Sequence, residues 1–312
     1  MLKEYSLIPD IFDQTQYSNA ALCGVMLNNI KTLILHEGIA SNLCDGGWSK
    51  YLTANNQRFH RAGIELISAI RKQSRMVKRQ RNGATLPITD LDWVNEALSS
   101  HATASLDGIL VSHTNAQNFA GQNIVSSIES LERCDWWNAR SESVRLKRIT
   151  NDYLQSLNLL LRNANSLIFI DPHLDLAKHG YSEFIQLLTA TERGNHNLNP
   201  KIEIHRVCYT KCGRDKAIET NEEWEKTFKR VLSPIVKSKE LKIEVFIWDD
   251  FHDRYLLSNL IGISVPNGFD ITTNPNVMTT WTRLSRDTAT DVQREFDPAS
   301  NRHSLIHRFR IV

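Results

Sequence analysis

The chain has 312 residues, of which 41% are hydrophobic and 23% are charged, and its formal net charge is +2. This length favours two domains, and the average composition excludes a disordered, collagen-like or coiled-coil protein. The balance of 37 Lys and Arg against 35 Asp and Glu excludes a generally basic, histone-like binder and leaves room for a local basic face.

The cysteines and the apolar runs point to a reducing compartment and away from a membrane. The five cysteines are odd in number and scattered, which favours free thiols over a disulfide framework. The longest apolar run, Ala20 to Leu27, is much shorter than the roughly 20 residues of a membrane helix. The first residues also lack the apolar segment of a secretory signal. We therefore expect a cytoplasmic protein with no membrane span.

Residues 1–130 predict an α-rich accessory domain, whose role the sequence does not indicate. The apolar spacing predicts helices over 20–43 and 58–79, then a turn and a short helix within 87–101, followed by a strand over 106–111. Asn82-Gly83 is expected to stop the second helix, and Asp90 is expected to cap the third.

Residues 131–312 predict an α/β domain with a mixed sheet flanked by helices. The expected elements alternate: helix 149–164, strand 166–170, helix 181–190, strand 201–209, helix 221–232, strand 241–248 and a further strand from about 254. Pro234 is expected to mark the end of the third helix. Alternating strands and helices imply a mainly parallel or mixed sheet.

Chemistry is expected where these strands end, because ligands of open α/β sheets gather at the carboxyl ends of the strands. One end continues into Asp171-Pro172-His173, and another leads through Phe251 to His252-Asp253-Arg254. In an extended segment, His252 and Arg254 project on the same side. A neutral imidazole can attack phosphorus, and an adjacent guanidinium can neutralise the phosphoryl oxygens. The alternative is a polar strand entrance that is exposed and has no catalytic role.

The pattern His252-x-Arg254-x-x-x-x-Asn259, followed by Gly262 and the segment 266–270 (PNGFD), resembles the phospholipase D-like superfamily. The signature of that superfamily is H-x-K-x-x-x-x-D followed by a glycine-containing strand. The region 140–312 is similar to single-copy members such as the MIT C-terminal domain and related bacterial proteins. The resemblance implies a nucleophile at His252, a phosphate-binding cation at Arg254 and an asparagine, Asn259, in place of the motif aspartate. It implies no metal and no cofactor.

The departures from the signature favour binding over turnover. Arginine keeps the positive charge of lysine and improves bidentate phosphate binding, but it cannot give up a proton. Asparagine at 259 lacks the negative charge that would stabilise a histidinium.

The resemblance leaves two functions open, one enzymatic and one not. Active members bring two motifs together, whereas this chain has one, so a metal-independent nuclease or phosphodiesterase acting on DNA or RNA through His252 needs a homodimer. The alternative is a non-catalytic module that binds nucleic acid or a phosphorylated partner within a bacterial antiviral defence or mobile-element complex.

Other basic residues are candidates for phosphate binding. His173 is expected either to face His252 as an acid or second phosphate ligand, or to lie on the surface of a turn. Arg206, with Lys211 and Arg214 beyond it, would make the rim of the site electropositive. Arg75, Lys78 and Arg79 share one face of the expected helix 58–79, which predicts salt-dependent nucleic-acid binding or else a solvated helix end.

Metal sites are not expected. His205, Cys208 and Cys212 offer zinc-ligating atoms, but no second pair of ligands accompanies them. The acidic residues of the first half have no metal-binding spacing, and we expect them in caps and turns: Asp10, Asp13, Asp45, Asp90, Asp92 and Asp107.

Overall fold

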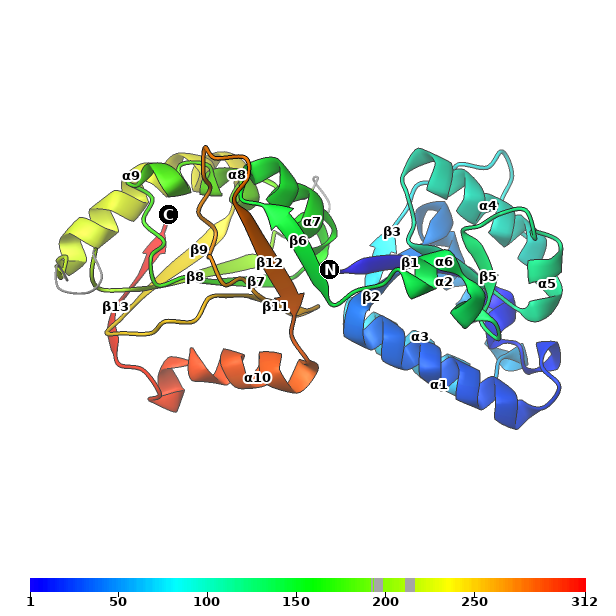
Figure 1. Ribbon diagram of the computed structural model, residues 1–312. Helices are drawn as coiled ribbons and strands as arrows, with labels where there is room; N and C mark the ends of the chain where they lie inside the picture. Colours follow the sequence, from blue (N-terminus) through cyan, green and yellow to red (C-terminus); the bar gives the residue numbers. More distant parts are fainter. Residues whose placement is uncertain (192, 194–198, 211–216) are drawn as a thin grey trace. The chain divides into compact units, whose positions relative to one another are not determined.

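The structure, a computed structural model, describes residues 1–191, 193, 199–210 and 217–312. It consists of two compact units (Figure 1). The N-terminal unit is Leu2–Ser141, and the C-terminal unit is Glu142–Val312 together with Met1.

A parallel five-stranded sheet lies at the centre of the N-terminal unit. Its strands are β1 (Lys3–Leu7), β2 (Gly38–Asn42), β3 (Met76–Lys78), β4 (Gly108–Val111) and β5 (Val125–Ser127), in the order β3-β2-β1-β4-β5. Its helices are α1 (Ala20–Glu37), α2 (Leu43–Ala54), α3 (Arg61–Lys72), α4 (Asp90–Thr103), α5 (His113–Gln117) and α6 (Asp135–Asn138). Helices α1 and α3 pack side by side on one face of this sheet, and α4 lies on the other (Figure 1).

Two expectations for this unit need correction. It is rich in helix, as predicted, but of its five strands the sequence located only β4, within the strand expected over 106–111. The helices expected over 20–43 and 58–79 are both too long: the first ends at Glu37 and is followed by β2, and the second ends at Lys72 before β3. Strands such as β2 (GIASN) and β5 (VSS) are too short and too buried on both faces to show the alternation that identifies a half-exposed strand.

The two units divide between Ser141 and Glu142, beyond the predicted boundary at 130. Residues after 130 stay with the N-terminal unit because they complete its core. Leu131 is buried there, and Trp136 and Trp137 pack against the same cluster. Arg140 then donates to the buried carboxylate of Glu37 at 2.8 Å.

The C-terminal unit is an α/β domain with a mixed eight-stranded sheet, as the sequence predicted. Its strands are β6 (Ser143–Lys147), β7 (Ser166–Ile170), β8 (Lys201–Val207), β9 (Lys242–Trp248), β10 (Tyr255–Ser258), β11 (Gly262–Ser264), β12 (Met278–Arg283) and β13 (Leu305–Ile311). The order is β13-β9-β8-β7-β10-β11-β12-β6, in which β7, β8 and β9 run parallel and the other pairs are antiparallel.

Helices cover both faces of this sheet. Helices α7 (Thr150–Asn163), α8 (Phe184–Thr189) and α9 (Asn221–Lys239) lie on one face, and α10 (Arg286–Glu295) lies on the other (Figure 1). Helix α9 continues past Pro234, which was expected to stop it, because the residues after the proline still bury an apolar side chain, Val236.

Candidate functional site

The strand register brings the two polar strand ends of the C-terminal unit together. Strand β10 runs antiparallel to β7 with Tyr255 opposite Ile170. The residues just before β10 therefore lie beside the residues just after β7. His252 and Arg254 thus lie beside Asp171 and His173 at one end of the sheet, and we call this end the edge of the candidate site. The sequence predicted this arrangement as one of two alternatives for His173.

Asp171 is the buried centre of this edge. One carboxylate oxygen, Oδ1, accepts from the backbone N–H of His173 at 3.0 Å, and Oδ2 accepts from the Tyr181 hydroxyl at 2.9 Å and the Phe269 N–H at 3.2 Å. Burial raises the pKa of Asp171, while these hydrogen bonds and Arg254 oppose the rise. Gly268 approaches Asp171 so closely that a Cβ atom there would overlap Oδ2, and its φ of +70° also favours glycine.

Arg254 is oriented by this buried carboxylate. Its Nε lies 3.6 Å from Asp171 Oδ1, and its Nη1 donates to the carbonyl oxygen of His252 at 3.2 Å. Its side chain is 25% exposed, and Nη2 donates no hydrogen bond to any residue that the structure describes. Part of a fixed guanidinium is therefore available to an anion at the surface.

The two histidines of this edge differ in their surroundings. His252 is exposed, whereas His173 is partly buried. Burial lowers the pKa of His173, and the positive charges of Arg254 and Lys178 lower it further. His173 is therefore a neutral imidazole at neutral pH, which suits a hydrogen-bonding ligand of phosphate better than a general acid.

Asn259 does not join this edge, and its predicted place in the site is wrong. It lies at the opposite end of β10, where Oδ1 accepts from the N–H groups of Asn165 at 2.7 Å and Ser166 at 3.4 Å. A strand advances about 3.3 Å per residue, which carries Asn259 roughly 16 Å from Arg254. Its amide instead satisfies backbone donors at the start of β7.

Arg206 is not part of an electropositive rim, because it is completely buried. Its Nε, Nη1 and Nη2 donate to the carbonyl oxygens of Val207, Leu174 and Tyr209 at 2.7 to 2.8 Å. Its guanidinium carbon also lies 3.4 Å from the ring centroid of Trp224. Burial lowers its pKa to about 10. Lys211 and Arg214, the other predicted rim residues, lie outside the described residues.

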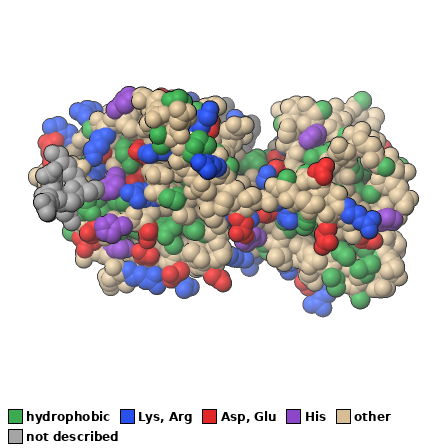
Figure 2. Space-filling model, viewed as in Figure 1, with side chains coloured by type: hydrophobic (Ala, Val, Ile, Leu, Met, Phe, Trp, Pro, Cys, Tyr) green, Lys and Arg blue, Asp and Glu red, His purple; other side chains and the backbone are tan. Residues whose placement is uncertain are grey.

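Arg75, Lys78 and Arg79 of the N-terminal unit do not form one exposed basic surface. Arg75 is buried, and its Nη1 donates to the carbonyl oxygens of Ile34 and Gly38 at the end of α1. Arg79 forms a bidentate ion pair with the buried Glu4. Of the three predicted residues, Lys78 is exposed. Positive and negative side chains are intermixed on the face of the molecule that Figure 2 shows.

The sequence reasoning missed part of the support of this site. Tyr181, which holds Asp171, carried no sequence signal. Arg148 forms an ion pair with Asp270, and Tyr153 donates to the Asp270 carbonyl oxygen at 3.1 Å. The segment 266–270, which is part of the family resemblance, indicated Gly268 and Asp270, but nothing in the sequence indicated the residues that they contact.

The described residues contain no group of three or more His, Cys, Asp or Glu side chains arranged to hold a metal ion. Cys212 of the zinc candidate lies outside the described residues. Two of the acidic residues of the first half lie in caps as expected: Asp13 accepts from Thr15 N, and Asp92 completes the capping box of α4. The predicted cap at Asp90 is wrong, because Thr89 is the N-cap of α4 and Asp90 pairs with Arg58. Asp10 accepts from Ser112 N, Asp45 from Arg81 N, and Asp107 from Glu4 N.

Comparisons with known proteins provide no family for this chain. No family model matches it, and no curated protein matches it. Among solved structures, it is similar to TrmBL2, an archaeal chromatin protein reported to show a novel mode of DNA binding. The identity is 10% and the TM-score is 0.30, over 79% of this chain and 84% of that chain. So low a score carries no argument about this chain. Among its described helices, none has both the length and the apolar character needed to cross a membrane.

Proposed function

We propose that the C-terminal unit recognises a phosphodiester of a nucleic acid at the edge formed by His252, Arg254 and His173. The observation that supports this proposal is the ion pair between Arg254 and the buried Asp171. A guanidinium that is already oriented loses little entropy when it binds, and its planar donors match two phosphate oxygens. The resemblance of His252-x-Arg254 to the phospholipase D-like signature supports the same ligand class.

Hydrolysis is the catalytic form of this proposal, and it requires two copies of the chain. The imidazole of His252 attacks phosphorus, so that an N–P bond forms as the bond from phosphorus to the leaving oxygen breaks. A second imidazole gives that oxygen a proton, and water then hydrolyses the phosphohistidine. His173 is a poor acid for this step because its pKa is lowered. The second imidazole would therefore be His252 of another copy in a homodimer.

One observation favours the non-catalytic alternative, a module that holds nucleic acid as a subunit of a defence or mobile-element complex. A nucleophilic imidazole needs a partner that fixes its orientation and tautomer. Asn259, the residue in the motif position for this task, lies at the far end of β10. The ring of His252 forms no hydrogen bond with any residue in the described part of the chain.

Cleavage and binding assays on the full chain separate these forms. Single- and double-stranded DNA and RNA would be incubated with the protein in EDTA, alongside His252→Ala and a control, His113→Ala, in which an exposed histidine of the N-terminal unit is replaced. EDTA-resistant cleavage by a dimer, lost in His252→Ala alone, supports the enzyme. Binding without cleavage supports the module.

The binding arm tests the proposal itself. Arg254→Ala should weaken nucleic-acid binding by about 10-fold or more, the expected effect of losing hydrogen bonds to a charged group. Arg286→Ala, which removes an exposed arginine of α10, is the matched control and should have little effect. Equal affinities of the wild type and Arg254→Ala would refute the proposed site.

A further inference from the structure

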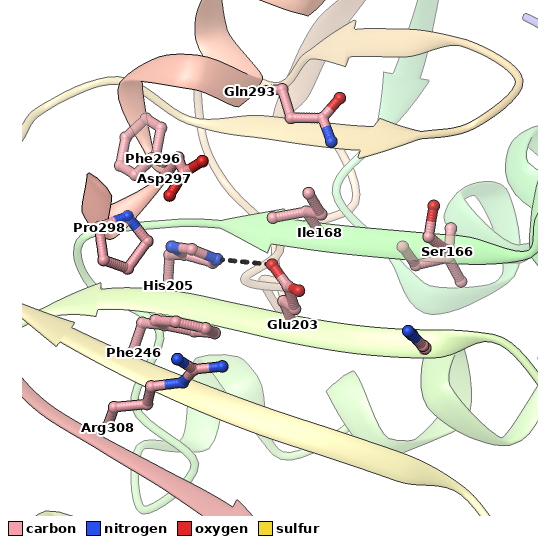
Figure 3. A pocket seen from close by; sticks show the side chains of 12 residues that line it. Ser166, Ile168, Glu203, His205, Phe246, Gln293, Phe296, Asp297, Pro298 and Arg308 are labelled. Carbon is pink, nitrogen blue, oxygen red and sulfur yellow. Dashed lines mark hydrogen bonds and ion pairs between the residues drawn. The ribbon is translucent and has the colours of Figure 1, made fainter. Parts of the chain in front are cut away.

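A cavity of the C-terminal unit lies on the sheet face that α10 covers, and none of the residues of the proposed phosphodiester site lines it. Its volume is about 340 Å³, within the range of roughly 300–1,000 Å³ that is usual for small-molecule sites. Strands β7, β8 and β9 form its floor, and Gln293 of α10 and Phe296, the residue that follows this helix, lie above it (Figure 3). Its wall includes apolar surface from Ile168, Phe246 and Pro298.

His205 is the buried polar group of this cavity. It is 1% exposed, and its ring stacks on Phe246 with a centroid distance of 4.5 Å and an interplanar angle of 7°. Trp248 Nε1 donates to His205 Nδ1 at 3.0 Å. Because an indole nitrogen can only donate, Nδ1 must be the acceptor, and the neutral imidazole must carry its proton on Nε2. Burial lowers the pKa of His205, which keeps this neutral form at neutral pH.

Glu203 lies two residues earlier on the same strand and on the same face as His205 (Figure 3). Its Oε2 lies 3.4 Å from His205 Nε2, a long hydrogen bond, and its side chain is 37% exposed. Apart from this contact, its carboxylate has no hydrogen-bond or ion-pair partner among the described residues. The cavity therefore presents a carboxylate with spare acceptor capacity next to an N–H donor that is engaged only by this long contact and can be shared with a ligand.

Of guanine and adenine, the purines of nucleic acids, this order of a donor followed by acceptor oxygens matches guanine. The Watson–Crick edge of guanine has an acceptor, O6, beside two donors, N1–H and the 2-amino group. Adenine has the opposite arrangement, since its N1 is an acceptor and would face the Glu203 carboxylate. A site built to hydrogen-bond a ligand edge rejects analogues that leave its polar groups unpaired.

We propose that this cavity binds a guanine base, with His205 Nε2–H donating to O6 and the Glu203 carboxylate accepting from N1–H and the 2-amino group. The planar base lies against the apolar surface between α10 and the sheet. The base can belong to a free nucleoside or nucleotide, or to a nucleic-acid strand. This inference concerns residues other than His252 and Arg254, so it stands independently of the phosphodiester site.

Calorimetric titration of the full chain tests the proposal with guanosine, adenosine, an oligo(dT) strand and the same strand with a single dG. We expect guanosine to bind saturably and more tightly than adenosine. Binding of the dG strand in preference to oligo(dT), without binding of guanosine, would still support the proposal and would assign the base to a strand. Absence of both preferences would overturn it.

Two variants assign the binding to this cavity. Glu203→Gln keeps the shape of a partly exposed side chain and should weaken guanine binding by about 10-fold or more, because a charged acceptor is lost. Gln293→Trp changes an exposed residue of α10 and should block the cavity. Glu222→Gln, on the exposed surface of α9, is the matched control. If both cavity variants bind guanine like the wild type, the base lies elsewhere and the proposal fails.

The same variants keep this proposal separate from the proposed function. Arg254→Ala should leave guanosine binding unchanged, and Glu203→Gln should leave the binding of oligo(dT) unchanged. Failure of one site therefore does not carry over to the other.

Discussion

Arg79 connects several segments of the N-terminal unit, and replacing it should destabilise this unit. Its Nε and Nη2 donate to the two carboxylate oxygens of Glu4 at 2.6 and 2.7 Å. Its Nη1 donates to the Ala104 carbonyl oxygen at 2.6 Å. The Arg79 side chain is 11% exposed and that of Glu4 is 2% exposed, so this ion pair lies largely out of solvent.

The size of the effect follows from the carboxylate that Arg79→Met leaves behind. Removing one partner of a buried ion pair costs about 3–5 kcal/mol, because the remaining charge is buried without compensation. In the described part of the chain, Glu4 would keep a side-chain hydrogen bond from Ser41 alone, at 2.7 Å. Since whole domains are stable by about 5–15 kcal/mol, we expect this substitution to remove a large part of the stability of the unit.

Urea unfolding followed by tryptophan fluorescence measures this loss, since Trp48 and Trp93 are buried in the same unit. Lys78→Met, an exposed neighbour on β3, is the control and should change the free energy of unfolding by less than about 0.5 kcal/mol. The double variant Glu4→Gln/Arg79→Met should lose less than the sum of the two single variants. A loss below about 1 kcal/mol in Arg79→Met, together with weaker nucleic-acid binding, would refute this account.

Two further predictions concern the C-terminal unit. Gly268→Ala should lower its melting temperature, since left-handed backbone costs about 1–3 kcal/mol and the new Cβ would overlap Asp171. Gly180→Ala in the same unit, where the added atom comes no closer than 3.4 Å to its neighbours, should have a much smaller effect, and equal shifts would contradict the geometry. His205 has a folded-state pKa below its ordinary value of 6.5, so the unfolded chain takes up the proton first and stability falls as pH drops below 6.5. Between about pH 7.5 and 5.5, the melting temperature of His205→Gln should fall less steeply with decreasing pH than that of the wild type. Some slope should remain, because the pKa of His173 is also lowered. An unchanged slope would show that the pKa of His205 is not lowered.

The sequence predicted the C-terminal unit better than the N-terminal one because its strands are longer and richer in apolar residues. Strands β7, β8 and β9 lie within one or two residues of their predicted bounds. Strand β3 in the N-terminal unit has three residues, and its Met-Val-Lys sequence continues a helical pattern as well as it starts a strand. Tertiary pairing with β2 decided between the two.

The candidate site also combines features that the sequence predicted with features that depend on strand pairing. The sequence predicted a strand from about residue 254, and β10 begins at Tyr255, so His252 and Arg254 lie just before the strand and not in it. Residue spacing did not reveal that Asp171 would hold Arg254, because that contact depends on the pairing of β10 with β7. Asn259 shows the opposite error: it is close in sequence, but an extended strand carries it to the other end of the sheet.

Local sequence by itself determined where most secondary structure of the C-terminal unit begins and which polar residues follow its strands, because apolar periodicity and turn residues act over a few neighbours. Tertiary structure alone decided which arginines face solvent. Arg75, Arg79 and Arg206 have the same side chain as Arg254, but each of them is surrounded by carbonyl or carboxylate oxygens from distant segments. The sequence determines the charge of each arginine, whereas the oxygen acceptors that surround it come together only when the chain has folded.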